Sequence, residues 1–214
     1  MNGDGEIDYV RVIDKSDKDA HAFILQAAVS ENENQDIAVI ELEKKGDQNA
    51  ALQIVGDEDI YGEETIVTPA GGAQASSPAP SGNTNVNVWM WPAVSYVYAP
   101  AYTVWVSPWG WRARPVWWRP WRPVRYAVFY PYAAPYRNHY VVVRRSRVIS
   151  AHRIYAPVRT TSVIVRTRHQ ASITNYRTSR ETTVHRGGRR VTRTTTVQGP
   201  RGNVRTTKRT RVRR

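Results

Sequence analysis

The sequence predicts a mainly β fold, in which a small antiparallel β-meander is followed by a largely disordered or extended low-complexity C-terminal half. Three observations lead to this prediction. Residues 7–13 and 36–44 alternate in their apolar side chains, residues 20–30 and 50–56 are largely apolar, and clusters of turn-forming residues separate these runs. Residues 1–70 hold 17 of the 18 Asp and Glu and 5 of the 31 Lys and Arg, so they carry a charge of −12 against +25 for the rest. All eight Trp lie between Trp89 and Trp121.

These shifts in composition divide the chain into four parts. Residues 1–69 form the acidic β-meander domain, and residues 70–88 form a linker rich in Gly, Ser, Pro and Asn. Residues 89–140 are rich in Trp, Tyr and Pro, and residues 141–214 form a basic tail rich in Arg and Thr. A chain organised in this way is not one ordinary globular enzyme.

The acidic domain contains four predicted strands, over residues 7–13, 20–30, 36–44 and 50–56. The polar runs between them, including residues 14–19, predict turns that join the strands into a meander. Residues 20–30 are apolar and equally compatible with a buried helix, and periodicity does not decide between the two. A domain of this size buries only about 60% of its unfolded surface, so we expect it to be marginally stable alone.

The aromatic segment carries regularly spaced prolines. Pro92, Pro100 and Pro108 recur at intervals of eight residues, which predicts short extended or polyproline-like pieces. The stretch over residues 65–111 has no charged residue, but the same prolines argue against a transmembrane helix. Arg alternates with Trp and Pro farther on, so the Trp side chains are candidates for aromatic contact with a partner. These candidates are Trp105, Trp109, Trp111, Trp117, Trp118 and Trp121.

The basic tail has no Leu, and beyond residue 165 its Val and Ile residues stand singly among charged and polar residues. Such a composition does not form its own core. Arg keeps its charge and binds phosphate, sulfate and carboxylate groups, so the tail predicts binding to polyanions. The alternative is a solubilising tail that binds polyanions only non-specifically. The candidate polyanion-binding residues are Arg144, Arg145, Arg147, Arg189, Arg190, Arg201, Arg205, Arg209, Arg211, Arg213 and Arg214.

The first residues resemble a calcium-binding loop. The run NGDGEID matches the D-x-N-x-D-G-x-x-D pattern from its third position onward. In this register Asn2, Asp4 and Asp8 supply side-chain oxygens and Glu6 supplies its backbone carbonyl. The first Asp of the pattern is missing, so we expect Ca²⁺ binding chiefly in an N-terminally longer form. The alternative is a polar Asx-type turn that opens the first hairpin.

The sequence offers little that predicts catalysis. The chain has no Cys, and Glu181 is the only carboxylate residue after position 70. His21 lies on an apolar strand, where a structural role is expected, and the other His residues lack metal-ligand spacing. The acidic run over residues 57–64 fits a solvated turn better than a cation site. We therefore expect a protein that is not an enzyme.

The runs NGDGEIDYVRVID, QDIAVIELEK and GDEDIYGE, followed by the Trp/Pro/Tyr stretch and the Arg/Thr tail, resemble a family of uncharacterised, predicted exported proteins of Gram-negative bacteria. In that group a signal peptide and a further segment precede the calcium-like loop. The resemblance therefore implies that this chain is N-terminally truncated and that the complete protein is extracytoplasmic: periplasmic, on the outer surface or secreted. It implies no activity.

The leading hypothesis is a non-enzymatic cell-envelope or secreted protein that binds an anionic polymer or envelope surface. The alternative is a cytoplasmic protein that binds nucleic acid non-specifically. The opposite charges of the two halves also allow the tail to fold back onto residues 1–70, which salt-sensitive compaction would support.

Overall fold

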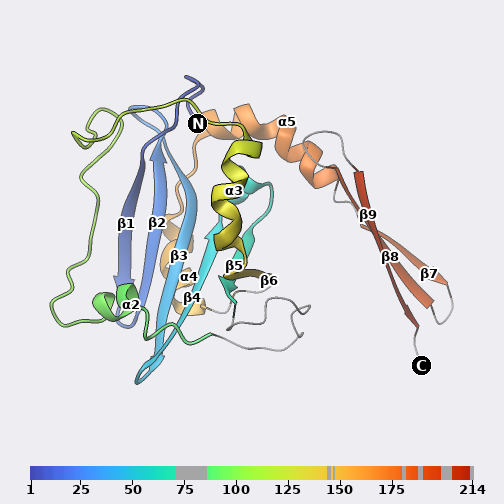
Figure 1. The fold of residues 1–214 in the computed structure, drawn as a ribbon, viewed down its shortest axis with the longest axis horizontal. Coiled ribbons are helices and arrows are strands. Elements are labelled where there is room, and N and C mark those ends of the chain that lie inside the picture. The colour runs from blue at the N-terminus through green and yellow to red at the C-terminus, as the bar shows by residue number, and fades with distance from the viewer. Residues whose placement is uncertain are drawn as a thin grey trace.

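The computed structural model of the chain describes residues 1–70, 86–143, 146, 148–179, 182–187, 190–198 and 204–212, with side chains up to residue 176. Its largest element is a six-stranded antiparallel sheet in the order β1-β2-β3-β4-β5-β6 (Figure 1). The antiparallel meander predicted for the N-terminal residues is confirmed, and its second run is a strand and not a helix. The strands are β1 (Val10–Asp17), β2 (Ala20–Ala28), β3 (Asn34–Gly46), β4 (Asn49–Gly56), β5 (Thr65–Pro69) and β6 (Tyr140–Val143).

The first hairpin is tighter than the sequence predicts. β1 begins three residues later than expected and continues through the predicted turn at residues 14–19 as far as Asp17. Only Lys18 and Asp19 remain as the turn, and Lys18 has the positive φ of 51° that a two-residue hairpin turn requires. The strand continues because Asp14, within the predicted turn, is buried and accepts a hydrogen bond from the Tyr102 hydroxyl.

The last two strands were not predicted. β5 follows the acidic run, and β6 lies at the boundary between the aromatic segment and the tail. The two strands pair antiparallel, with Ile66 opposite Val143 and Pro69 opposite Tyr140. The far edge of the sheet therefore comes from a segment distant in sequence.

One face of the sheet is covered by α4 (Ile149–Tyr155), which lies behind the strands in Figure 1. Tyr155 contributes its ring to the core on this face, and Ile154 packs beside it. A second cluster joins the same helix to the sheet through Val148 and Ala151. The largest core cluster on this face consists of Ala22, Ile24, Val39, Val55, Ile66 and Tyr155.

The opposite face is covered by the residues around α2 (Pro92–Val97). Val88 and Val94 pack on Leu42 and Ala50 of the sheet, and all four are buried. Pro92 occupies the first turn of α2, where its missing N–H costs no hydrogen bond. The sheet thus lies between two covering layers, as a sheet with two apolar faces requires.

Helices in the C-terminal half make the mainly β description only partly correct. The expectation of short extended pieces over residues 89–140 is corrected by α2 and by α3 (Tyr126–Arg137), which contains Pro131 and Pro135. The tail contains α4, a 3₁₀ helix η1 (Ala156–Val158) and α5 (Val163–Ser179). A further short helix, α1 (Glu58–Tyr61), replaces the turn expected in the acidic run.

The start of α5 has a local cause that the composition concealed. The Ser162 hydroxyl accepts a hydrogen bond from the Val165 amide at 3.2 Å, as an N-cap serine does. A carboxylate oxygen of Glu33, which directly precedes β3, accepts another from the Ile164 amide at 3.1 Å. The β-branched and Arg-rich sequence of α5 is thus held in a helix by contacts at its first turn.

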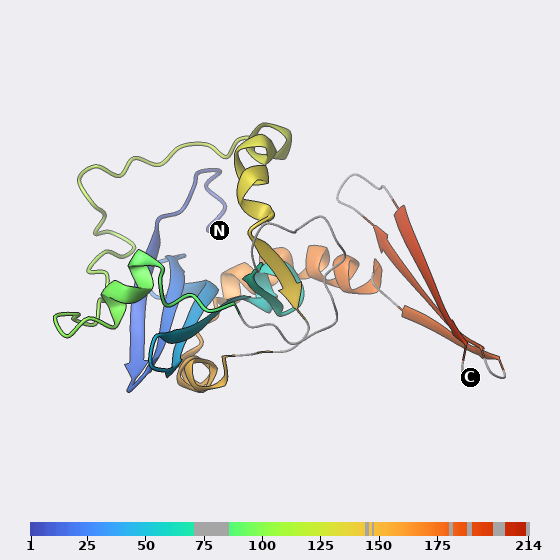
Figure 2. The same cartoon turned by 60° about the horizontal axis from the view of Figure 1, so that its bottom comes forward.

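A second, three-stranded sheet follows α5 and lies apart from the six-stranded sheet in both views (Figures 1 and 2). Its strands are β7 (Thr182–Gly187), β8 (Arg190–Gln198) and β9 (Val204–Val212), in that order. Among the described residues, no helix combines the length and the apolar character needed to cross a bilayer.

Candidate functional site

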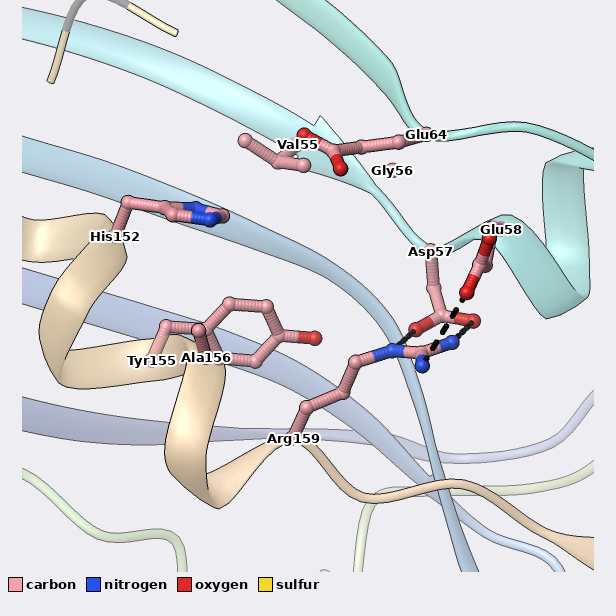
Figure 3. A pocket seen from close by; sticks show the side chains of 9 residues that line it. All are labelled: Val55, Gly56, Asp57, Glu58, Glu64, His152, Tyr155, Ala156 and Arg159. Atoms are coloured by element: carbon pink, nitrogen blue, oxygen red, sulfur yellow. Dashed lines mark hydrogen bonds and ion pairs between the residues drawn. The ribbon is translucent and has the colours of Figure 1, made fainter. Parts of the chain in front are cut away.

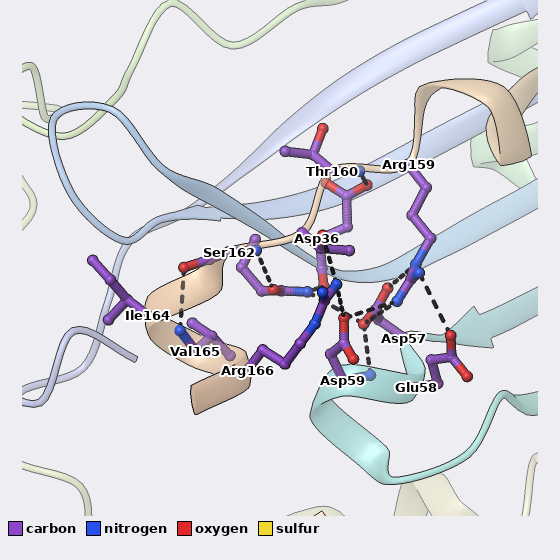
Figure 4. Close-up of polar contacts among 12 residues, drawn as sticks. Asp36, Asp57, Glu58, Asp59, Arg159, Thr160, Ser162, Ile164, Val165 and Arg166 are labelled. Carbon is purple, nitrogen blue, oxygen red and sulfur yellow. Dashed lines mark hydrogen bonds and ion pairs between the residues drawn. The ribbon is translucent and has the colours of Figure 1, made fainter. Parts of the chain in front are cut away.

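Residues 148–168, here called the basic arm, cross one face of the acidic sheet and bind it through charged and polar contacts (Figure 4). Arg159 is the centre of these contacts. Its Nε lies 2.6 Å from one carboxylate oxygen of Asp57, and its Nη2 lies 3.1 Å from the other. Nη2 also contacts Asp59 at 3.2 Å, and Nη1 contacts Glu58 at 3.5 Å. The hydrogen bonds that Arg159 donates to Asp57 raise the pKa of Arg159, so the guanidinium stays charged.

Asp57 is positioned for this pairing by two roles at once. Its side chain is 0% exposed, and its Oδ1 accepts the Asp59 amide at 2.9 Å as the N-cap of α1. The same oxygen accepts the Gln35 side-chain amide at 3.2 Å. Because the cap fixes the direction of α1, the acidic first turn of that helix faces Arg159.

Next to this ion pair, the arm backbone binds the start of β3 through one backbone hydrogen bond and two hydrogen bonds to side chains. The Asp36 amide donates to the Thr160 carbonyl at 2.9 Å, and the Thr160 amide donates to the Asp36 carboxylate at 2.8 Å. The Ser162 amide donates to the Gln35 side-chain oxygen at 2.9 Å. Asp36 is 0% exposed, and burial raises its pKa although the hydrogen bonds from the Thr160 amide and the Gln26 side chain oppose the shift.

The third contact of the arm is made by His152 of α4. Its Nδ1 lies 2.8 Å from Oε1 of Glu41, a carboxylate that is 0% exposed in the middle of β3. Gln53 of β4 donates to the other oxygen of Glu41 and accepts the Val148 amide at 3.1 Å. Burial raises the pKa of Glu41, and the hydrogen bonds from Gln53 and His152 reduce that shift. Since a carboxylate accepts, this contact puts the proton of His152 on Nδ1.

A pocket of about 200 Å³ opens between β4, α1 and the arm (Figure 3). Arg159 and its carboxylate partners form one end, and the His152 ring and the Glu64 carboxylate project into the other. These two groups can form hydrogen bonds with a small polar ligand. Among the described residues, no three His, Asp or Glu side chains are grouped so as to hold a metal ion.

Sequence reasoning missed most of the residues through which the basic arm contacts the sheet. Glu41 lies on the same face as Val39 in the strand pattern, which places a carboxylate toward the core. A buried carboxylate requires a partner, and that requirement is the signal that could have pointed to a basic residue in the tail. The opposite charges allow the tail to fold back onto residues 1–70, and the basic arm contacts these residues through specific ion pairs.

The N-terminal loop is closed by its own hydrogen bonds. Asn2 accepts the Asp4 amide at 3.0 Å, and Asp4 accepts the Glu6 amide at 2.8 Å, which lowers the pKa of Asp4. The carboxylate of Asp8 pairs with the amino group of Met1. These are the Asx turns of the alternative interpretation. Calcium binding by this loop stays a prediction.

The predicted aromatic contact residues fall into two groups. Trp105, Trp117 and Trp121 are exposed at 56%, 74% and 53%, whereas Trp109, Trp111 and Trp118 are half-buried. Trp118 is held edge-on against Tyr9, with ring centroids 5.2 Å apart. Only the first group is free to meet a partner.

The structure describes four of the eleven predicted polyanion-binding arginines. Arg190 lies in β8, and Arg205, Arg209 and Arg211 lie in β9. The others lie outside the described residues: Arg144, Arg145, Arg147, Arg189, Arg201, Arg213 and Arg214.

Comparison of the chain with protein-family models, with curated proteins and with solved structures finds no match in any of the three.

His21 belongs to a second buried cluster, on the face covered by α2. Its Nδ1 lies 3.2 Å from both oxygens of Asp14, and the Tyr102 hydroxyl donates to Asp14 at 2.6 Å. Its ring stacks on Phe23 at 5.6 Å. The structural role expected for His21 agrees with this burial.

The buried phenols predict a loss of stability in alkali. Burial raises the pKa of Tyr98, Tyr102 and Tyr155, and the hydrogen bond to Asp14 adds to the shift at Tyr102. Their folded-state pKa values lie above the unfolded value of about 10. Their contribution is therefore complete below about pH 10 and is lost as the pH rises toward the folded values. We expect the melting temperature to fall steeply above about pH 10, with delayed appearance of tyrosinate absorbance.

Tyr102→Phe should lessen this alkaline loss, because it removes one phenol that the fold keeps protonated. Tyr132→Phe provides the matched control, since Tyr132 is 74% exposed. A melting temperature that stays constant through this range would contradict the prediction.

Proposed function

We propose that the protein is a non-enzymatic, extracytoplasmic binding protein that attaches to anionic polymers of the cell envelope through its basic C-terminal sheet. The extracytoplasmic location is supported by the family resemblance, and the binding by the distribution of charge. The acidic sheet acts as the scaffold that carries the basic segments.

The observation that carries this proposal is the charge of β7–β9. The three strands hold seven Lys and Arg and no Asp or Glu. Their register pairs Arg193 with Arg209 directly across two strands. Like charges at opposed positions destabilise a sheet, so a bound polyanion would stabilise this one.

Four buried carboxylates of the acidic half are already paired with groups outside the basic sheet. Asp36, Glu41 and Asp57 are bound by the basic arm, and Asp14 is bound by His21 and Tyr102. The arm thus occupies three buried carboxylates of the scaffold, and we propose that the basic sheet is the part that meets a partner.

The test is a titration of the full chain with heparin and with single-stranded DNA over a range of salt concentrations. The variant replaces Arg205, Arg209 and Arg211 with Ser, and the control replaces Arg112, Arg114 and Arg137 with Ser. We expect the slope of log K against log salt to decrease by about 2 to 3 in the variant only.

Similar affinities for heparin and DNA, with that loss, support attachment to envelope polyanions. A strong preference for DNA over heparin would instead support the cytoplasmic nucleic-acid-binding function. Equal losses in the variant and the control would overturn the assignment to β7–β9.

A further inference from the structure

Residues 116–132, here called the aromatic strap, form the most exposed apolar segment among the residues whose side chains are described. Every residue over 119–132 is exposed. Val116 and Trp117 are 86% and 74% exposed, and Phe129 and Tyr132 are 53% and 74% exposed. An exposed apolar segment of this length marks an interaction surface.

The strap is held in place at its first half. The Trp121 carbonyl accepts the Ile7 amide at 2.8 Å, and Trp118 packs against Tyr9 and against Trp121 at 5.0 Å. Beyond α3, β6 pairs with the edge of the sheet. The strap is therefore presented in a fixed position by contacts on both sides of it, which lowers the entropic cost of binding.

Helix α3 has apolar residues on all sides and no buried residue. A helix of this composition requires an apolar environment around it. Figure 2 shows its first turns standing clear of the two sheets. Arg125 precedes it and Arg137 ends it, so the charges lie only at its ends.

The partner must satisfy both the apolar and the charged groups of the strap. Arg119, Arg122 and Arg125 are interleaved with apolar residues, and the strap has no Asp or Glu. This charge requires an acidic surface and opposes docking of a second strap. The exposed Val116, Val124 and Val128 have no ring to stack on a sugar or a base, yet each gains from burial in hydrocarbon.

An anionic bilayer interface supplies both environments. Tyr and Trp favour the level of the lipid headgroups, Arg reaches the phosphates, and Val and Phe enter the acyl region. Pro120, Pro123 and Pro131 lack an N–H, which reduces the number of backbone donors left without a partner there. Each Arg close to such a surface also gains from its negative potential.

We propose that the aromatic strap is a membrane-interface anchor that inserts into an anionic lipid surface, with α3 at the level of the headgroups. This inference concerns a different segment from the basic sheet and adds a lipid surface to the partners proposed above. It rests on the extracytoplasmic or envelope role only for its biological setting.

The experiment adds vesicles of phosphatidylglycerol and phosphatidylcholine to the full chain and follows Trp emission. All eight Trp lie over residues 89–121, and three of them, Trp117, Trp118 and Trp121, belong to the strap, so the emission reports on the strap and the segment before it. We expect a blue shift with anionic vesicles, and quenching by lipids brominated on the acyl chain. Vesicles of phosphatidylcholine alone should bind at least about ten-fold more weakly.

The decisive variant is Phe129→Ser with Tyr132→Ser, which keeps every Trp as a reporter. Its matched control is Ile149→Ser with Val163→Ser, which removes two exposed apolar side chains, 53% and 66% exposed, from α4 and α5. We expect the first pair to weaken vesicle binding by about ten-fold or more and the second to leave it unchanged. All four positions are exposed, so unchanged melting curves should accompany both variants.

Three results would overturn the proposal: no binding to anionic vesicles, binding without quenching by brominated chains, or equal losses in the two double variants. Binding without quenching would indicate adsorption by the basic sheet, so the polyanion function would stand while the anchor failed. Absence of heparin binding together with intact vesicle insertion would mean that the anchor stands and the polyanion function fails.

Discussion

Arg159→Met is expected to destabilise the fold by about 2–4 kcal/mol. The substitution leaves Asp57, whose side chain is 0% exposed, without the fork that neutralises it. Removing one partner of a buried ion pair costs about 3–5 kcal/mol, and the lower range applies because Arg159 itself is 28% exposed. Urea denaturation followed by circular dichroism measures the change.

Two variants make this prediction specific. Arg159→Lys keeps the charge but not the two-pronged geometry, so it should recover only part of the loss. Arg112→Ala removes an ion pair with Glu31 whose side chains are 76% and 60% exposed, and it should change the stability by less than about 1 kcal/mol. Similar effects for Arg159→Met and Arg112→Ala would show that burial of Asp57 does not govern the pair.

The meander could be predicted from the sequence because its information is local. Alternation over β3 and the polar turns around it specify strands and hairpins from neighbouring residues alone. The register of β5 with β6 could not be predicted in this way, because the two strands meet only when the chain returns from the aromatic segment. Their pairing depends on tertiary contacts that periodicity does not contain.

The candidate site divides along the same line. The exposed Trp117 and Trp121 were found from composition, since aromatic residues among Arg and Pro have little core to enter. The contacts of the basic arm with the sheet were missed because Arg159 resembles every other Arg of the tail in sequence. Arg159 differs from the other Arg residues only in its partner Asp57, which is both a helix cap and a buried carboxylate.

The same reasoning predicts that the six-stranded sheet does not fold without the basic arm. A chain ending at Val143 keeps all six strands but loses the basic arm. One face of the sheet is then left uncovered, with Ile24, Val39 and Val55 exposed to water. The sheet would keep one covering layer of two, and a domain of this size has little stability to lose. We expect this truncated chain to lose cooperative urea unfolding and to bind the dye ANS.

A synthetic peptide of residues 146–168 should restore cooperative unfolding when added in trans, because it carries the contacts to Asp36, Glu41 and Asp57. An Arg159→Ala peptide should bind at least about 30-fold more weakly, as the loss of about 2 kcal/mol requires.

An Arg153→Ala peptide is the matched control, since it loses the same charge at an exposed position of α4. It should restore folding as well as the unaltered peptide does. Cooperative unfolding of the truncated chain alone would show that the arm decorates a finished domain. Equal rescue by the two variant peptides would mean that net charge, and not the Asp57 fork, brings the arm to the sheet. The predicted difference between them separates a specific structural layer from the general attraction that the opposite charges of the two halves suggest.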